Sequence, residues 1–368
     1  MTSASSNKPL VLVTGASGYV AGHCVKEMLE NGYRVRGTVR SLRDKRKVAH
    51  LHAMADAASL ELVEADLTRD EGWTDALEGC EYVLHVASPF PATVPDDETE
   101  LIGPAVEGTR RVLAAAAATG TVRRVVLTSS VAAIAFGHEN DTGKIYTEED
   151  WSDVERCEPY PKSKTLAERA AWDFVDAMAA NERFELAVIN PGFVAGPVLG
   201  SICGTSGEVV RRLMIRDLPA CPRIGWAVVD VRDVARAHRL ALEKPEAAGK
   251  RYIAAGDHVW MQDCARILAE EFRPLGYRIP TGRLPYWLMW IAARFDSTIR
   301  MALGYVGHRE EVSHDRAQRD LGWSPRPVRE TFVDMAHSMI ERGIVTGPGG
   351  RVPSRGDADT GAHAEAAA

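Results

Sequence analysis

Short apolar runs alternate with longer amphipathic stretches along the first two thirds of the chain. The runs, of which Leu10–Val13 is the first, are rich in Val, Leu and Ile, as in strands buried on both faces. In the stretches between them, apolar residues recur at spacings of three and four, which is typical of helices with one buried face. The predicted strands are 10–13, 33–40, 60–67, 81–89, 124–130, 185–191 and 251–255, and the predicted helices are 19–29, 44–57, 98–118, 159–178 and 230–241. This alternation predicts an α/β fold with a doubly wound parallel sheet.

The first predicted strand leads into a glycine-rich turn that opens a helix. Gly15, Gly18 and Ala21 give the spacing Gly-x-x-Gly-x-x-Ala. Gly15 permits a tight turn, Gly18 lets backbone amides approach a pyrophosphate at the positive end of the helix, and Ala21 allows close packing of helix and strand. An ordinary turn can hold two glycines by chance. The strand, helix and next strand around it favour a dinucleotide-binding βαβ unit instead.

The residue at the end of the second predicted strand discriminates between NAD and NADP. An acidic side chain there bonds both ribose hydroxyls of NAD and repels a 2′-phosphate. This chain has Arg40 at that position, followed by Arg43, Lys45, Arg46 and Lys47. A guanidinium suits the NADP phosphate, whereas a solvated, basic helix start accounts well for Arg43, Lys45 and Arg46. We therefore predict NADPH/NADP+ as the cofactor.

The ends of the third and fourth predicted strands carry further polar or small residues. Asp66 ends the third strand, where its carboxylate could meet the adenine amino group or cap the following turn. Ala87 and Ser88 follow the fourth strand and leave room for a cofactor. His85 lies inside that apolar strand, which favours a hydrogen-bonded core histidine over a catalytic base.

A serine, a tyrosine and a lysine together suit the reduction of a carbonyl group. Tyr160 and Lys164 are four residues apart on one predicted helix, so they share a face, and Ser130 ends the fifth strand. A tyrosine phenol with a pKa of about 10 is protonated at neutral pH, and an ammonium group nearby stabilises its phenolate. A serine hydroxyl can hold the substrate oxygen while negative charge develops on it. The alternative for Tyr160 and Lys164 is a simple pair on a helix surface.

Taken together in this order, the motifs resemble those of the extended short-chain dehydrogenase/reductases. The chain is most similar to the dihydroflavonol 4-reductase-like branch and the related NADPH-dependent aldehyde and carbonyl reductases. The resemblance covers residues 9 to about 256, with a weaker match through Leu321–Trp323 and Arg342–Gly343 to about residue 345. Its motifs are Val13–Ala21, Gly37–Arg40, His85–Pro89, Pro104–Thr109, Thr128–Ser130, Tyr160–Lys164, Ile189–Gly192 and Val229–Ala235.

The resemblance implies a role for each matched residue. Tyr160 would be the acid/base, Lys164 would bond the nicotinamide ribose and lower the tyrosine pKa, and Ser130, rather than Ser129, would orient the carbonyl. Arg40 and Lys47 would contact the 2′-phosphate of the cofactor, and Asp66 and Leu67 would flank its adenine. The segment from Pro191 to Val194 would run beside the nicotinamide carboxamide. The complete set expected at the cofactor is Gly15, Ser17, Gly18, Tyr19, Val20, Arg40, Lys47, Asp66, Leu67, Ala87, Ser88, Thr128, Tyr160, Lys164, Pro191, Gly192 and Val194.

The chain departs from the family pattern at two places. The predicted helix 98–118 contains no asparagine, so the proton-relay asparagine of many short-chain enzymes has no counterpart there. Ser130 is followed by Val131-Ala132-Ala133, where plant flavonoid enzymes tend to carry Ala-Gly-Thr. The second departure argues against a flavonoid substrate.

The motifs also divide the chain into a larger and a smaller part. We expect a Rossmann NADP-binding domain over 9–191, to which 228–256 returns, and a smaller substrate-binding lobe over 192–227 and 257–345. In that lobe, Pro285–Ile291 is aromatic and apolar, which favours a core helix over the wall of an apolar pocket. Such a pocket would include Phe90, Phe136 and Phe193 and would suit an apolar carbonyl. The tail 346–368 is rich in Gly, Ala, Ser and Asp, so we expect it to be disordered.

Composition excludes several other classes of protein. The chain has 368 residues, 45% of them hydrophobic and 26% charged, as in ordinary soluble proteins, and its net charge of −7 gives no reason to expect nucleic acid or a membrane as partner. Six scattered cysteines without metal-ligand spacing predict reduced thiols, several of them buried, in a cytoplasmic protein without a metal site. The start, Met1–Lys8, is polar and does not resemble a signal peptide.

Three functions remain open at this point. The first is NADPH-dependent reduction of an apolar or aryl aldehyde or ketone. The second is an NAD-dependent sugar-nucleotide epimerase or hydroxysteroid dehydrogenase, against which Arg40 argues. The third is a non-enzymatic nucleotide sensor, but such proteins generally lose the tyrosine or the lysine. The resemblance also implies that two copies could pair through the helices that begin near Glu98 and Pro159.

Overall fold

The computed structural model describes residues 9–55, 58–88, 97–138, 143–180, 183–294, 303, 305–307 and 309–347. These residues form two compact units. The first contains the described parts of 1–192, 231–255 and 312–325, and the second contains those of 193–230, 256–311 and 326–347. Phe90 and the predicted tail beyond residue 347 lie outside the described residues.

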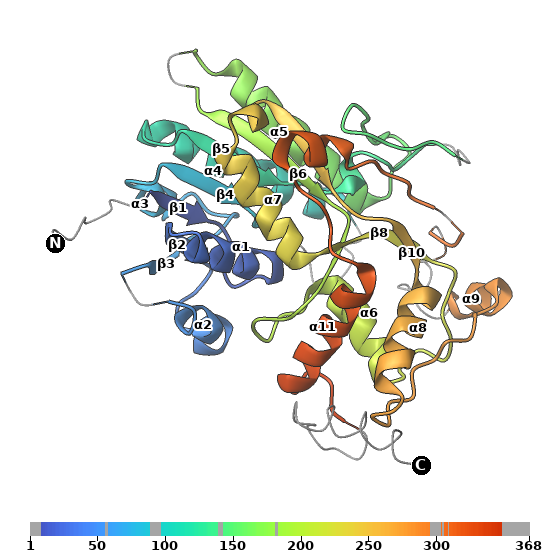
Figure 1. Ribbon diagram of the computed structural model, residues 1–368. Helices are drawn as coiled ribbons and strands as arrows, with labels where there is room; N and C mark the ends of the chain where they lie inside the picture. Colours follow the sequence, from blue (N-terminus) through green and yellow to red (C-terminus); the bar gives the residue numbers. More distant parts are fainter. Residues whose placement is uncertain are drawn as a thin grey trace. The chain divides into compact units, whose positions relative to one another are not determined.

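A seven-stranded sheet of wholly parallel strands organises the first unit (Figure 1). The strand order is β3-β2-β1-β4-β5-β6-β9, so the chain winds outward from β1 in one direction and from β4 in the other. The predicted doubly wound sheet is thereby confirmed. Ligands of such sheets bind beyond the carboxyl ends of the strands near this reversal. The strands are β1 (Leu10–Val13), β2 (Arg34–Val39), β3 (Leu60–Glu64), β4 (Tyr82–His85), β5 (Arg124–Thr128), β6 (Glu185–Pro191) and β9 (Lys250–Ala254).

Helices cover both faces of this sheet because each buried strand presents apolar side chains alternately to either side. On one face, Leu10, Leu12 and Val83 pack with residues of α3 (Trp73–Leu77), α4 (Thr99–Thr119) and α5 (Pro159–Ala177). On the other face, α1 (Tyr19–Glu30) and α7 (Val231–Glu243) contact each other and the strands. Helix α2 (Lys45–His52) follows β2. All six cysteines are free, and four of them are buried, as predicted.

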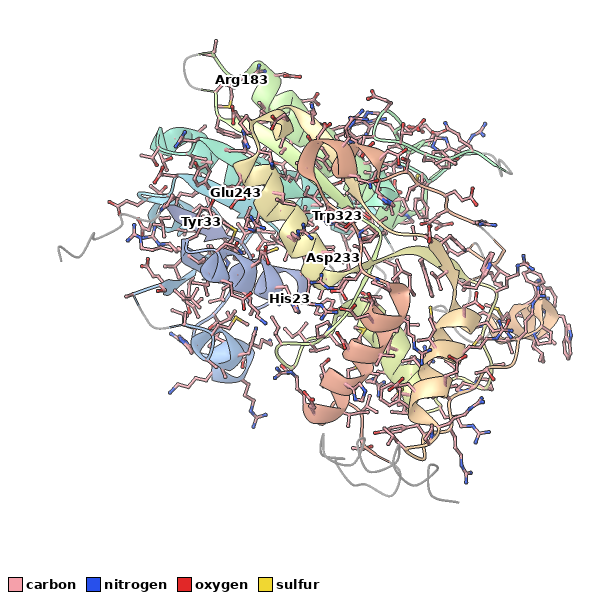
Figure 2. The ribbon with its side chains drawn as sticks, in the orientation of Figure 1. His23, Tyr33, Arg183, Asp233, Glu243 and Trp323 are labelled. Atoms are coloured by element: carbon pink, nitrogen blue, oxygen red, sulfur yellow. The ribbon has the colours of Figure 1, made fainter. Side chains whose placement is uncertain are left out.

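The segment 312–325 lies in the first unit, although the sequence had assigned it to the substrate-binding lobe. Its π-helical turn, η3 (Ala317–Leu321), ends at Gly322, which has a φ of +66°. The fully buried Trp323 follows and donates from Nε1 to the carbonyl oxygen of Asp233 on α7, at 2.8 Å (Figure 2). Burial of this indole holds the segment against the sheet unit.

The second unit is built on a three-stranded sheet of order β10-β8-β7. Strands β7 (Phe193–Ala195) and β8 (Gly225–Asp230) are parallel, and β10 (His258–Trp260) runs antiparallel to β8. Helices α6 (Gly204–Met214), α8 (Met261–Phe272) and α11 (Val328–Glu341) pack with this sheet. Among the described residues of both units, no helix is long and apolar enough to cross a membrane.

The prediction of a core helix over Pro285–Ile291 was wrong in one respect. A helix does form, α9 (Tyr286–Ala292), but Trp287 is 61% exposed and Trp290 is 48% exposed. Only Met289 among its large apolar side chains is buried. The aromatic composition predicted that this helix is buried. A short helix packs only one of its faces against the core, so the side chains on its other faces stay exposed.

Candidate active site

The turn between β1 and α1 has the conformation that its glycines allow. Gly15 has a φ of +66°, and a Cβ atom at this position would lie 2.9 Å from the Cβ of Ala87, so only glycine fits. The Gly15 amide donates to the Thr38 hydroxyl at 3.0 Å, and the Gly18 amide donates to the Gly15 carbonyl at 2.8 Å. These contacts fix the turn between the ends of β1, β2 and β4.

Helix α1 begins at this turn with its positive end uncovered. Gly18 is the N-cap and provides no side-chain hydrogen bond, and the first turn contains no acidic residue. Ser17, Tyr19 and Val20 lie beside it and are partly exposed. The first amides of a helix and its dipole attract an anion, so this end fits a pyrophosphate.

Thr14 links the buried ends of β1 and β4. Its hydroxyl lies 3.0 Å from Nδ1 of His85 and accepts from the Ala87 amide at 2.9 Å. His85 is only 1% exposed, and burial lowers its pKa to about 3, with a smaller contribution from the charge of Lys164. His85 is therefore a core histidine, as the sequence favoured. The contact to Ala87 also fixes the backbone before Ser88.

The residues expected to contact the adenosine half of the cofactor differ in exposure and in their partners. Arg40 is exposed after β2 and makes no hydrogen bond or ion pair among the described residues, so its guanidinium is available to an anion. Lys47 is paired with Asp44 at 3.2 Å. Asp66 caps its own turn, accepting from the Thr68 amide and hydroxyl, each at 2.9 Å, and these bonds lower its pKa. Leu67 lies against Gly108 of α4, where a Cβ atom would be 3.1 Å away.

Ser130, Tyr160 and Lys164 come together at the carboxyl end of β5. Proline at the first position of α5 starts the helix that carries Tyr160 and Lys164. The Lys164 Nζ lies 5.9 Å from the centre of the Tyr160 ring, and the Ser130 hydroxyl shares a hydrogen bond with the Tyr160 phenol. Ser130 Oγ also accepts from the Ala132 amide at 3.1 Å. Tyr160 as a whole residue remains 37% exposed.

The protonation of this group suits proton donation. Burial lowers the pKa of Lys164 to about 8, so the ammonium form predominates at neutral pH. Loss of solvation raises the pKa of Tyr160, and the hydrogen bond with Ser130 opposes that rise. The phenol therefore keeps its proton until a stronger base, such as a developing alkoxide, takes it.

The remaining expected cofactor residues lie on β5, β6 and β7 or, for Gly192, between β6 and β7. Thr128 ends β5, and its hydroxyl donates to Nε2 of the buried His238 at 2.6 Å, since Nδ1 of that ring bonds the Val234 carbonyl. Pro191 ends β6, and the amide of Gly192 donates to the Ala254 carbonyl at 3.1 Å. Val194 lies on β7 and belongs to the second unit.

Several polar residues that support this site were missed in the sequence. Thr14, Thr38 and His238 act through contacts between segments that are far apart in the chain. Glu168 could have been found, because it continues the spacing of four from Tyr160 and Lys164 along α5.

Comparison with known proteins agrees with this geometry. A model of the NAD dependent epimerase/dehydratase family matches residues 11–255. Cinnamoyl-CoA reductase 1 of Petunia hybrida is 39% identical over 339 residues, which cover 91% of this chain and 93% of the relative. An anthocyanidin reductase of Vitis vinifera is 34% identical over 289 residues, covering 74% of this chain and 83% of the relative.

A solved structure shows the same likeness in three dimensions. Yeast methylglyoxal/isovaleraldehyde reductase, complexed with NADPH, has a TM-score of 0.76 and 31% identity to this chain. The match covers 90% of this chain and 98% of that structure. The chain therefore belongs to the NAD-dependent epimerase/dehydratase family, within the extended short-chain dehydrogenase/reductases, and matches their dihydroflavonol 4-reductase-like and carbonyl reductase branch, as the resemblance predicted.

Proposed function

We propose that this protein reduces an aldehyde or ketone to the alcohol with NADPH, and that Tyr160 donates the proton. The observation that carries this proposal is the convergence of Ser130, Tyr160 and Lys164 at one strand end. The similar proteins are reductases, and one of them is solved with NADPH.

The residues around the glycine turn fit a phosphorylated dinucleotide. The uncapped start of α1 suits the pyrophosphate, and a side chain at Gly15 would meet Ala87, so the turn stays free of side chains there. The exposed Arg40 suits a 2′-phosphate. The bound nicotinamide would supply the hydride.

The protein's own residues would manage the proton. Ser130 would hold the carbonyl oxygen, and Tyr160 would protonate it as negative charge builds up. Lys164 would stabilise the resulting phenolate through its positive charge one helical turn away.

The substrate we propose is an apolar or aryl carbonyl compound. The names of the similar reductases include a cinnamoyl thioester, methylglyoxal and isovaleraldehyde, of which the first carries an aryl and the last a branched aliphatic group. Val131, Ala132 and Ala133, which follow Ser130, are apolar and buried. A flavonoid substrate is not proposed.

Steady-state turnover with NADPH and with NADH, against aryl, branched aliphatic and bulky carbonyl compounds, tests the proposal. We expect NADPH-dependent turnover of the apolar compounds. Tyr160→Phe should nearly abolish turnover and leave NADPH binding unchanged. Tyr33→Phe is the control, because the Tyr33 hydroxyl bonds Glu243 instead, at 3.2 Å. A fully active Tyr160→Phe variant would overturn the proposal, as would NAD retained through purification without carbonyl turnover, which indicates an epimerase.

A further inference from the structure

A third residue of α5 lies on the same helix face as Tyr160 and Lys164. Glu168 follows Lys164 by four positions, one helical turn further on. Its side chain is completely buried. A buried carboxylate is costly unless its oxygens are paired and hydrogen-bonded.

The carboxylate of Glu168 binds the end of the strand that carries Ser130. Its Oε2 accepts from the Ser129 hydroxyl at 2.5 Å and from Nδ2 of Asn190 at 2.8 Å. The same Asn190 amide group donates to the carbonyl oxygen of Ser130 at 3.1 Å. Glu168 thus holds the backbone on both sides of the Ser130 α-carbon, once through Ser129 and once through Asn190.

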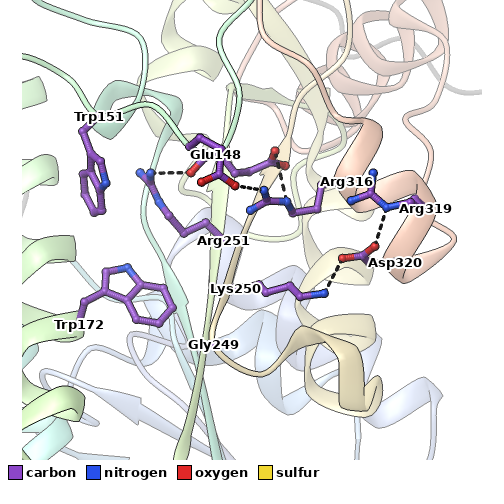
Figure 3. A pocket seen from close by; sticks show the side chains of 10 residues that line it. Glu148, Trp151, Trp172, Gly249, Lys250, Arg251, Arg316, Arg319 and Asp320 are labelled. Atoms are coloured by element: carbon purple, nitrogen blue, oxygen red, sulfur yellow. Dashed lines mark hydrogen bonds and ion pairs between the residues drawn. The ribbon is translucent and has the colours of Figure 1, made fainter.

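Arg251 on β9 balances the buried charge. Its Nε donates to Oε1 of Glu168 at 2.5 Å. Its Nη1 donates to the carbonyl oxygens of Glu148 and Asp150, at 3.0 and 2.8 Å. The guanidinium also lies 3.7 Å from the centre of the Trp151 ring (Figure 3). These contacts hold the Arg251 guanidinium in one orientation, and the guanidinium in turn fixes the position of the Glu168 carboxylate.

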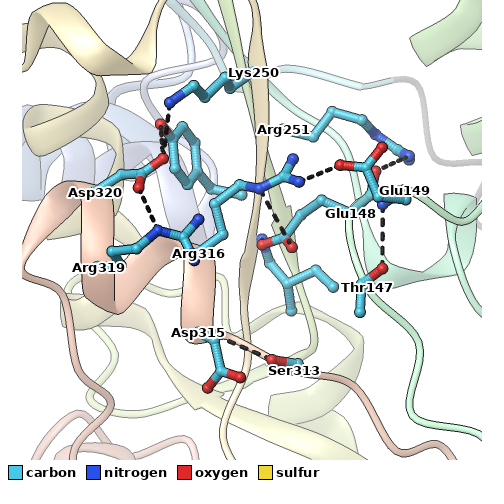
Figure 4. A network of polar contacts seen from close by, with 12 residues as sticks. Thr147, Glu148, Glu149, Lys250, Arg251, Ser313, Asp315, Arg316, Arg319 and Asp320 are labelled. Carbon is cyan, nitrogen blue, oxygen red and sulfur yellow. Dashed lines mark hydrogen bonds and ion pairs between the residues drawn. The ribbon is translucent and has the colours of Figure 1, made fainter.

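Further ion pairs hold the surroundings of Arg251. Glu148 accepts from the Ile253 amide at 3.0 Å and pairs with Arg316 at 3.8 Å. On the other side of this cluster, Asp320 pairs with Lys250 at 2.9 Å and with Arg319 at 3.0 Å (Figure 4). These residues line a cavity of about 620 Å³ on the outer side of β9. The charged residues that line the cavity already form ion pairs with one another, so we infer that they hold Arg251 in place.

We propose that Glu168 is a positioning residue for the reaction, setting the place of Ser130 relative to Tyr160 and Lys164. Because one carboxylate joins the helix of the acid to the strand end of the serine, it fixes the separation of the two hydroxyl groups. This inference rests on the proposed function, in which Ser130 holds the substrate oxygen. Displacements near 1 Å at a reacting centre can lower rates by about 100-fold.

Glu168→Gln keeps the shape of the side chain and removes its charge. One carboxylate oxygen becomes an amide donor, so the side chain cannot accept from Ser129, Asn190 and Arg251 together. We expect kcat to fall by about 10- to 100-fold, with NADPH affinity changed by less than about 3-fold. Glu185→Gln is the matched control, because Glu185 pairs with the buried Arg124 at the opposite ends of β5 and β6. Its kcat should stay within about 2-fold of wild type.

A double variant separates positioning from stability. Glu168→Gln alone leaves Arg251 as a buried charge without its partner, which lowers stability. Glu168→Leu with Arg251→Met removes both charges together with the oxygen that accepts from Ser129 and Asn190, so the midpoint of urea unfolding should recover in part while kcat stays low. A double variant with wild-type kcat would show that Glu168 only balances Arg251, and would overturn the inference.

Hydrogen exchange provides a readout that does not depend on turnover. The Ala132 and Ala133 amides donate to the hydroxyl and the carbonyl oxygen of Ser130. In the double variant, both amides should exchange at least about 10-fold faster than in wild type, while the helical amides of α7 are unchanged. Unchanged exchange at Ala132 and Ala133 would also overturn the inference. If the wild type reduces no carbonyl, the proposed function fails, and this measurement still decides whether Glu168 holds Ser130.

Discussion

At the scale of single residues, the charge of Lys164 sets the pH range of the proposed reaction. Its pKa is lowered to about 8 by burial, so the cation is present below that pH and lost above it. Without the cation, the Tyr160 phenolate that forms on proton donation loses its stabilisation. We expect kcat/KM for carbonyl reduction to fall as the pH rises through about 8.

Lys164→Arg provides the comparison for this pH profile. An arginine keeps its charge throughout this range, so the fall in kcat/KM should move to higher pH, even if the variant is slower overall. Identical midpoints in the two profiles would mean that a group other than Lys164 titrates.

Arg40 should determine the preference for NADPH over NADH. A charge-assisted hydrogen bond is worth about 1.5–3 kcal/mol, so Arg40→Ala should raise KM for NADPH by about 10- to 100-fold and leave KM for NADH nearly unchanged. Lys47→Ala should have a smaller effect, because Lys47 is already paired with Asp44. An equal loss with both cofactors would argue against a phosphate contact.

Residue types in sequence order predicted the groups that the proposed reaction uses directly, and missed the residues that hold them. Ser130, Tyr160 and Lys164 were predicted because the chemistry demands these residue types, and the structure brings them together. Glu168 meets Asn190 and Arg251 only through the pairing of β5, β6 and β9. The spacing of four along α5 indicates Glu168 itself, but local spacing does not show which distant strands pair, so it does not indicate the partners Asn190 and Arg251.

At the scale of elements, the turn between β1 and α1 can be tested against a second glycine. Gly15 and Gly120 have φ values of +66° and +63°, so alanine at either should cost about 1–2 kcal/mol of unfolding free energy. At Gly15, the new Cβ would also meet Ala87 at 2.9 Å, whereas nothing lies within 4 Å at Gly120. Overpacking adds about 1–3 kcal/mol, so urea unfolding should show a larger loss for Gly15→Ala. Equal losses would mean that the turn relaxes freely.

Element type was easier to predict than element environment. Apolar periodicity predicted α5 as a helix, aromatic and apolar composition predicted α9 as one, and both form. It could not predict that the aromatic side chains of α9 are exposed, because a hydrophobic side chain carries no information about whether a partner surface is within reach. The π-helical turn η3 was likewise not foreseen, since its place depends on the burial of Trp323.

At the scale of the whole molecule, two buried neutral histidines should make the fold sensitive to acid. Burial lowers the pKa of His85 to about 3 and that of His238 to about 4. In the unfolded chain, each takes up a proton near pH 6.5. Between the folded-state and unfolded-state pKa values, the unfolded state binds more protons than the folded state. The unfolding free energy therefore decreases as the pH is lowered below about 6.5, by up to about 1.4 kcal/mol per pH unit for each histidine.

Urea unfolding from pH 7 down to pH 4.5 measures this loss. His238→Gln keeps a hydrogen-bonding side chain and removes one titration, so its stability should decline less steeply than that of wild type over the same range. Parallel curves for the two proteins would show that His238 does not titrate on unfolding.

The first unit is assembled from three separate stretches of chain, two of which supply the strands of its sheet. Strand β9 and the segment 312–325 reach it only after parts of the second unit have intervened in the sequence. During synthesis, β6 must therefore wait as an unpaired edge until residue 254 has emerged, and unpaired edges invite association with other chains. Any fragment that ends between β6 and β9 would expose the edge of β6 permanently, so we expect such a fragment to associate with other chains.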